Sequence, residues 1–132
     1  MLRRDILLAE VEKLALILAR LVGLKQEGKQ AEFTQIAEDT ALKEYDIALE
    51  ELLNMPLPDF EAWLPQQAIS ADKLDALAHL LYLHSEPFNV ETIPGIRKIL
   101  LIYDLLEQKH HRQSLDNINR RKQIERFMVN NT

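Results

Sequence analysis

The chain has 132 residues, of which 47% are hydrophobic and 28% charged; it contains no cysteine and carries a formal net charge of −5 at pH 7. A chain of this length buries enough surface to fold without crosslinks, so we expect a single domain over residues 1–132. The composition excludes disulfide scaffolds, cysteine metal sites, and collagen-like or disordered chains.

The opening of the chain places a basic pair, Arg3 and Arg4, before an apolar segment, which is the order found in export signals. Charged residues at Asp5, Glu10 and Arg20 interrupt the apolar run, whereas a membrane span needs about 20 mostly apolar residues in one piece. We therefore expect no export signal, no membrane span and a cytoplasmic location. The lack of cysteine agrees with a reducing compartment.

Charge is distributed unevenly along the chain. Residues 1–96 carry 8 basic and 17 acidic side chains, whereas residues 97–132 carry 8 basic and 4 acidic ones. This asymmetry favours contact between an acidic body and a basic last helix, or head-to-tail contact between molecules. A nucleic-acid-binding domain more often has a denser basic patch, so we do not expect nucleic acid as the partner.

The first segment, residues 4–27, has the apolar spacing of a long helix. Its apolar residues alternate at four and three positions and form one stripe, made of Leu7, Val11, Leu14, Leu18 and Leu21. Further apolar residues widen the stripe well beyond one face, so the helix must be covered by other helices or by a second copy. The stripe is therefore the predicted protein interface, and a homodimer is the predicted assembly.

The second segment, residues 29–54, is predicted as a helix that forms an antiparallel hairpin with the first. Gly28 suits the end of the first helix, because glycine readily adopts the left-handed conformation found there. Pro56 and Pro58 stop the second helix, because proline cannot continue it and restrains the residue before it.

Two helices are predicted in the middle of the chain from their caps. Asp59 is the expected N-cap of a short helix that ends at Leu64. Ser70 is the expected N-cap of a longer helix over residues 71–84, whose leucines fall on one face.

Two more helices are predicted toward the end of the chain. Thr92, with Pro94 just inside, marks the start of a helix that runs to about residue 109. Ser114 is expected to cap a last helix over residues 115–129. The inward-facing residues of this last helix should be Leu115, Ile118, Ile124, Phe127 and Met128. Because this apolar face is thin and interrupted, we expect the last helix to be the least stable element.

The predicted fold is all-α, with about six helices arranged as stacked antiparallel hairpins with helical-repeat-like packing. The segment Arg4-Asp5-Ile6-Leu7 at the start of a long amphipathic helix, and the later run from Gly23 to Lys29, resemble a family of small uncharacterised bacterial proteins with a tetratricopeptide-like helical fold. The resemblance covers roughly residues 3–54. It implies an architecture and no chemistry.

Glu107 and His110 have the Glu-x-x-His spacing that lets a carboxylate and an imidazole share a metal on one helix face. Di-metal bundles need a second such motif and two further glutamates, and this chain has a single copy. The alternative interpretation is an exposed helix end whose histidine and lysine suit the helix dipole. Glu107 and His110 are therefore weak metal candidates.

Asp75 and His79 lie four residues apart and could orient one another as an acid and base pair. No serine, threonine or lysine at matching spacing completes a nucleophile arrangement. The alternative is an ordinary surface pair on one helix face.

Basic side chains are concentrated near the end of the chain. The candidate anion or partner surface consists of Arg112, Arg120, Arg121, Lys122 and Arg126. Arg120, Arg121 and Lys122 are expected on the solvent side of the last helix, where long basic side chains can shield apolar surface. These residues could complement the acidic body of the chain, bind a protein partner, or bind nucleic acid.

Phe60, Trp63 and Tyr82 could line a binding groove, because aromatic residues are enriched at binding hot spots. The alternative is that they fill the core.

The sequence favours a non-enzymatic helical scaffold or adaptor that acts by protein–protein interaction or self-association. Neither glycine-rich phosphate-binding motif occurs, and no complete reactive constellation is present, so we expect no catalytic residues and no cofactor. The alternative is a small helical metal-binding or enzymatic domain that uses Glu107 and His110, with Asp75 and His79 as further candidates. A weaker option is a nucleic-acid accessory protein that uses the last helix.

Overall fold

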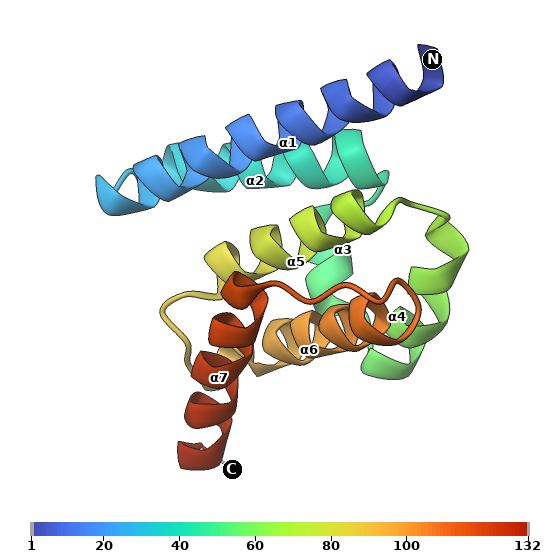
Figure 1. Cartoon of the computed structure of the whole chain (residues 1–132). Helices are drawn as coiled ribbons and strands as arrows, with labels where there is room; N and C mark the ends of the chain where they lie inside the picture. The colour runs from blue at the N-terminus through green and yellow to red at the C-terminus, as the bar shows by residue number, and fades with distance from the viewer. Residues whose placement is uncertain (1, 132) are drawn as a thin grey trace. The chain divides into compact units, whose positions relative to one another are not determined.

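The computed structural model describes residues 2–131, with side chains from Asp5 onward, and Figure 1 shows that this part of the chain is helical. The α-helices are α1 (Leu2–Gln26), α2 (Gln30–Tyr45), α3 (Leu49–Asn54), α4 (Leu57–Trp63), α5 (Ala71–Ser85), α6 (Ile93–Gln108) and α7 (Leu115–Asn130). Two short 3₁₀ segments are η1 (Leu64–Gln67) and η2 (Val90–Thr92). No strand occurs within the described range, and the prediction of an all-α fold is confirmed.

The single helix predicted over residues 29–54 is wrong, because α2 ends at Tyr45 and α3 begins at Leu49. Asp46, between them, adopts the left-handed conformation with φ 54° and ψ 38°. Tyr45, Ile47 and Leu49 are all buried, although residues two apart lie on different sides of a continuous helix. The break in the helix allows all three side chains to be buried.

The short helix predicted to start after Asp59 begins earlier. α4 starts at Leu57 with Pro56 at its N-cap, and Asp59 lies in its first turn. Pro58 is tolerated in that turn because the first N–H groups of a helix have no partner within the helix. After α4 the chain continues directly into η1.

The other predicted helix starts agree with the structure. The Oγ atom of Ser70 accepts a hydrogen bond from the backbone N–H of Lys73 at 3.1 Å, as an N-cap does. α6 begins directly after Thr92 with Pro94 in its first turn. Ser114 caps α7 in the same way as Ser70 caps α5.

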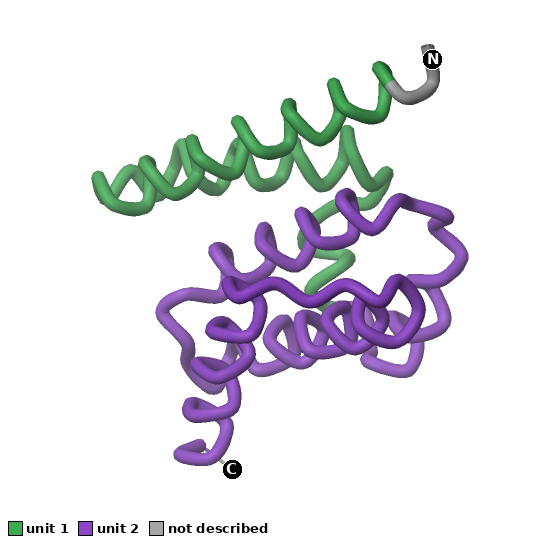
Figure 2. Tube along the Cα trace, in the orientation of Figure 1, with its two compact units in different colours: residues 1–54 green, residues 55–132 purple. Residues whose placement is uncertain are grey.

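The backbone forms two compact units, residues 1–54 and 55–132, shown in two colours in Figure 2. In the first unit α1 and α2 form an antiparallel hairpin, and Gly28 takes a positive φ of 72° at its turn. The buried residues of these two helices include Leu14, Leu21, Phe33 and Ala37.

In the second unit α5 and α6 form another antiparallel hairpin and supply most of the buried side chains. These include Leu74, Leu77, Leu81, Ile96, Ile99 and Ile102. Lys98 of α6 is buried as well, and its Nζ atom lies 5.8 Å from the ring centre of Phe60, a cation–π contact. Burial lowers the pKa of Lys98. α4 and α7 contact α6.

Within the described residues, no helix combines the length and the apolar character needed to cross a membrane. The two hairpins are those of the predicted architecture, while tetratricopeptide-like packing between hairpins remains a prediction.

Candidate functional site

The N-terminal part of α1 extends beyond the end of α2. Lys13 lies beside Glu44, near the end of α2, with its Nζ atom 2.8 Å from the glutamate Oε1 atom. α1 has 25 residues and α2 has 16, and Figure 1 shows α1 continuing toward the N-terminus past that end. We call residues 5–12 the α1 overhang; at about 1.5 Å per residue it is about 12 Å long.

The predicted interface stripe on α1 is divided between core and surface. Leu14 and Leu21 are 3% and 0% exposed, so they belong to the core and offer no surface to a partner, contrary to the prediction. Val11 and Leu18 are half-buried. Leu7, on the overhang, is 45% exposed, because α2 does not reach it.

Three further aliphatic residues of α1 are exposed and were not part of the predicted stripe. Ile6 and Leu8 flank Leu7 on the overhang, and Leu16 lies farther along the helix. The sequence signal for them was the width of the apolar face, which exceeds what one neighbouring helix can cover. The candidate interface is therefore the overhang and not the whole stripe.

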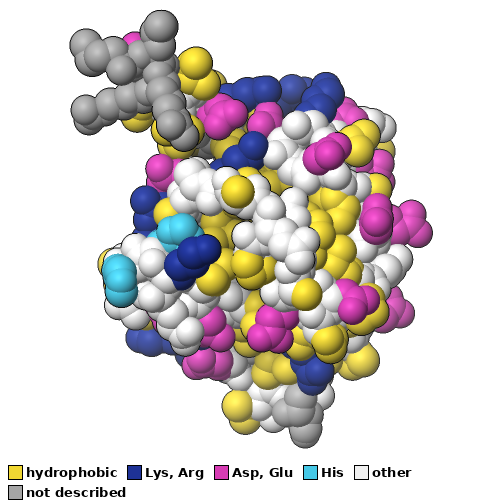
Figure 3. Space-filling view, turned by 90° about the vertical axis from the view of Figure 1, so that its right-hand side faces the viewer, with side chains coloured by type: hydrophobic (Ala, Val, Ile, Leu, Met, Phe, Trp, Pro, Cys, Tyr) yellow, Lys and Arg dark blue, Asp and Glu magenta, His cyan; other side chains and the backbone are white. Residues whose placement is uncertain are grey.

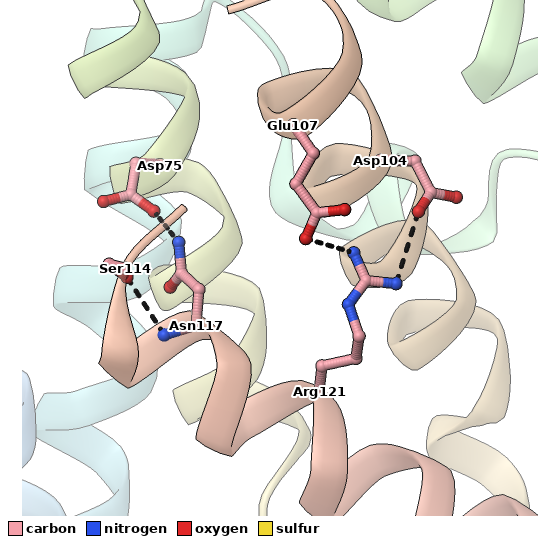
Figure 4. A network of polar contacts seen from close by, with 6 residues as sticks. All are labelled: Asp75, Asp104, Glu107, Ser114, Asn117 and Arg121. Carbon is pink, nitrogen blue, oxygen red and sulfur yellow. Dashed lines mark hydrogen bonds and ion pairs between the residues drawn. The ribbon is translucent and has the colours of Figure 1, made fainter. Parts of the chain in front are cut away.

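A second candidate site lies where α7 contacts α5 and α6, and Figure 4 shows its polar contacts. The guanidinium group of Arg121 donates to a carboxylate oxygen of Asp104 at 3.2 Å and to one of Glu107 at 3.1 Å. The same guanidinium lies 5.6 Å from the ring centre of Tyr103. Arg121 thus joins α7 to two successive turns of α6.

Arg120 and Asn117 join α7 to α5. The Nη2 atom of Arg120 is 3.3 Å from His79 Nε2, and its guanidinium lies 5.7 Å from the ring centre of Tyr82. The side-chain amide of Asn117 donates to Asp75 at 2.7 Å (Figure 4). Asp75 and His79, predicted as a mutual pair, are therefore each engaged by a residue of α7.

The environment of this contact perturbs two titratable groups. Burial, and then the charge of Arg120, lower the pKa of His79 to about 4, so the imidazole is neutral at pH 7 and can accept the arginine N–H. Burial raises the pKa of Tyr103 to about 12. The Arg120 guanidinium acts on the pKa of the Tyr103 hydroxyl in the opposite direction, by its charge and by a side-chain hydrogen bond.

The predicted orientation of the basic residues is wrong for Arg120 and Arg121, which are half-buried against α5 and α6 and do not lie on the solvent side of the helix. Their partners are an imidazole and carboxylates from helices far away in the sequence. Lys122 and Arg126 are exposed, and Arg112 pairs with Asp72 of α5. Leu115, predicted to face inward, is also exposed.

The charged side chains on the face drawn in Figure 3 are mixed. Among the coloured, described residues of that face, lysine and arginine occur in several places, and acidic side chains lie near them.

The two weak metal candidates, Glu107 and His110, have different surroundings. The Glu107 carboxylate is paired with Arg121, and His110 lies beyond the end of α6 at Gln108. No group of three or more histidine, aspartate or glutamate side chains that could hold a metal ion was found among the described residues.

The three candidate groove aromatics belong to two separate ring contacts. Phe60 stacks on Trp63 at 5.8 Å between ring centres. Tyr82 instead contacts Phe88 edge-on, and Phe88 contacts Phe127 of α7. These three rings border an open groove of about 420 Å³ with Arg126 among its lining residues. Phe88 and Phe127 were missed because they come from a loop and a distant helix.

Comparisons of the chain with protein-family models, with curated proteins and with solved structures found no match.

Proposed function

We propose that this protein is a non-enzymatic, cytoplasmic helical scaffold that acts by protein–protein interaction, and that the α1 overhang binds a second copy of the chain. The observation that carries the proposal is the exposure of three successive aliphatic residues, Ile6, Leu7 and Leu8, on a helix that extends past its neighbour. Burying such residues against a partner is favourable by about 1.5–3 kcal/mol for each side chain that is fully covered.

The apolar spacing of the overhang suits a second copy. Leu7 continues the four-and-three spacing of the α1 stripe, which is the spacing of a coiled-coil seam. Two overhangs packed about a two-fold axis present the same apolar surface to each other, so each covers the exposed aliphatic residues of the other.

The proposed likeness of residues 3–54 to a tetratricopeptide-like bacterial family is in keeping with this function. The α1–α2 hairpin, with Gly28 at its turn, is the element on which that likeness rests.

The test is sedimentation velocity over a dilution series of the wild-type chain and of Leu7→Glu. Leu7 is half-exposed, so a charge there is compatible with the folded chain. We expect a wild-type dimer and a Leu7→Glu monomer with an unchanged circular dichroism spectrum. The matched control is Leu115→Glu, which places the same charge at an exposed leucine of α7 and should leave the dimer intact.

Two outcomes contradict the proposal. A wild-type chain that sediments as a monomer at every concentration removes self-association. A Leu7→Glu variant that stays dimeric shows that the overhang is not the contact.

A further inference from the structure

α7 is joined to the rest of its unit by polar contacts and by a thin apolar face. Of its sixteen residues only Ile124 is fully buried, and Ile118, Phe127 and Met128 are half-buried. Arg120, Arg121 and Asn117 supply hydrogen bonds to α5 and α6, and Phe127 adds one ring contact to Phe88. A helix with so little buried apolar surface has a low free energy of local opening compared with helices such as α5, in which eight residues are buried.

The surface beneath α7 is specialised for arginine. We call it the arginine seat and define it by Asp75, His79 and Tyr82 of α5 with Tyr103, Asp104 and Glu107 of α6. Two carboxylates receive one guanidinium, a neutral imidazole receives another, and a tyrosine ring lies under each. Planar guanidinium groups bind carboxylates and stack on aromatic rings, whereas a lysine ammonium matches neither geometry as well.

We propose that the arginine seat is a binding site for an arginine-bearing amphipathic helix of a partner protein, and that α7 is its releasable occupant within the same chain. The partner is defined by the contacts that α7 makes: two adjacent arginines, an aliphatic residue three positions after the second, and an aromatic residue three positions further, as in Arg120, Arg121, Ile124 and Phe127. This is helix-in-groove recognition, in which the anchors of the bound helix lie on one face. The site is separate from the α1 overhang and does not depend on self-association.

The test uses a fluorescently labelled peptide with the sequence of residues 113–131 and measures its binding to the full-length chain by anisotropy. In the wild-type chain α7 occupies the seat, and the affinity for the peptide is reduced by the fraction of molecules whose seat is open. Arg121→Glu should release α7, because it places a third carboxylate beside Asp104 and Glu107 while the seat itself keeps all its residues. We expect the peptide to bind this variant at least about tenfold more tightly than the wild type.

Matched controls come from the same helix. Lys122→Glu makes the same charge change at the adjacent, exposed position and should leave the peptide affinity at the wild-type value. Ile124→Ala releases α7 without altering charge and should increase the affinity as Arg121→Glu does. A peptide that itself carries Arg121→Glu should not bind, and binding of the unaltered peptide should weaken as salt is raised.

Each opposite result overturns the proposal. Equal binding of the peptide to wild type, Arg121→Glu and Lys122→Glu shows that the seat is not the site. Failure of the peptide to bind Arg121→Glu and Ile124→Ala chains whose α7 amides have become unprotected in hydrogen exchange shows that the seat does not accept a helix from outside.

Discussion

The replacement of Ile124 by alanine tests whether α7 opens separately from α5 and α6. Ile124 is 0% exposed and is the only fully buried residue of α7. The substitution removes three carbon atoms at about 0.8 kcal/mol each, and the remaining cavity adds to this loss, for a total of about 3 kcal/mol. Since every 1.4 kcal/mol is a factor of ten, the equilibrium constant for opening α7 should rise about a hundredfold.

Hydrogen exchange measured by mass spectrometry resolves this effect along the chain. Amides of α7 should exchange about a hundred times faster in Ile124→Ala than in the wild type, whereas amides of α5 and α6 keep most of their protection because their core is intact. The control is Val129→Ala, an exposed aliphatic position of α7, which should change stability by less than about 0.5 kcal/mol.

Two results for Ile124→Ala contradict the separate opening of α7. If α5, α6 and α7 all gain exchange by the same factor, α7 unfolds only with the whole unit and is no releasable occupant. If no amide changes, Ile124 does not hold α7 in place.

Two further predictions concern pH and backbone strain. The pKa of His79 is lowered from 6.5 to about 4 in the folded chain, by burial and then by Arg120 of α7, against the opposing charges of Asp75 and Asp116. The unfolded chain therefore binds the extra proton between these values, and stability falls as the pH is lowered through them. His79→Gln keeps an acceptor for Arg120 but does not titrate. Its free energy of unfolding, measured by urea titration, should therefore fall less than that of the wild type between about pH 7 and pH 5. An identical dependence of the free energy of unfolding on pH in both chains contradicts this prediction. Ala68 adopts the left-handed conformation with φ 49°, which costs a residue with a side chain about 1–2 kcal/mol, partly offset by the greater freedom of glycine in the unfolded chain. Ala68→Gly should raise the free energy of unfolding, measured by urea titration, by about 0.5 kcal/mol. The control Ala62→Gly, inside α4, should lower the free energy of unfolding by about 1 kcal/mol. A loss of stability in Ala68→Gly contradicts the prediction that Ala68 is strained.

The sequence by itself determined the fold class and most helix starts, because these depend on interactions within a few residues. Ser70 and Ser114 cap their helices through N–H groups three residues later, and Pro94 suits only the first turn of α6. Apolar spacing identified α1, α5 and α6 for the same reason, since the period of a helix is a local property.

Only the tertiary structure decided the break between α2 and α3. Asp46 adopts a left-handed conformation, which a short polar residue tolerates without requiring it. The break became favourable because it buries Tyr45, Ile47 and Leu49 together, and burial depends on neighbours that a local pattern does not contain.

The candidate sites show the same division between local and distant interactions. The 4–3 spacing of α1 was visible in the sequence, but which of its leucines are exposed depends on where α2 ends, as the pairing of Lys13 with Glu44 shows. Asp75, His79 and Glu107 were recognised as separate candidates, yet their partners are Asn117, Arg120 and Arg121, which lie 42, 41 and 14 residues away in the sequence. The pairing of a guanidinium with a carboxylate depends on their distance in the folded chain and not on their separation in the sequence. Only the folded chain therefore brings these residues together in one site.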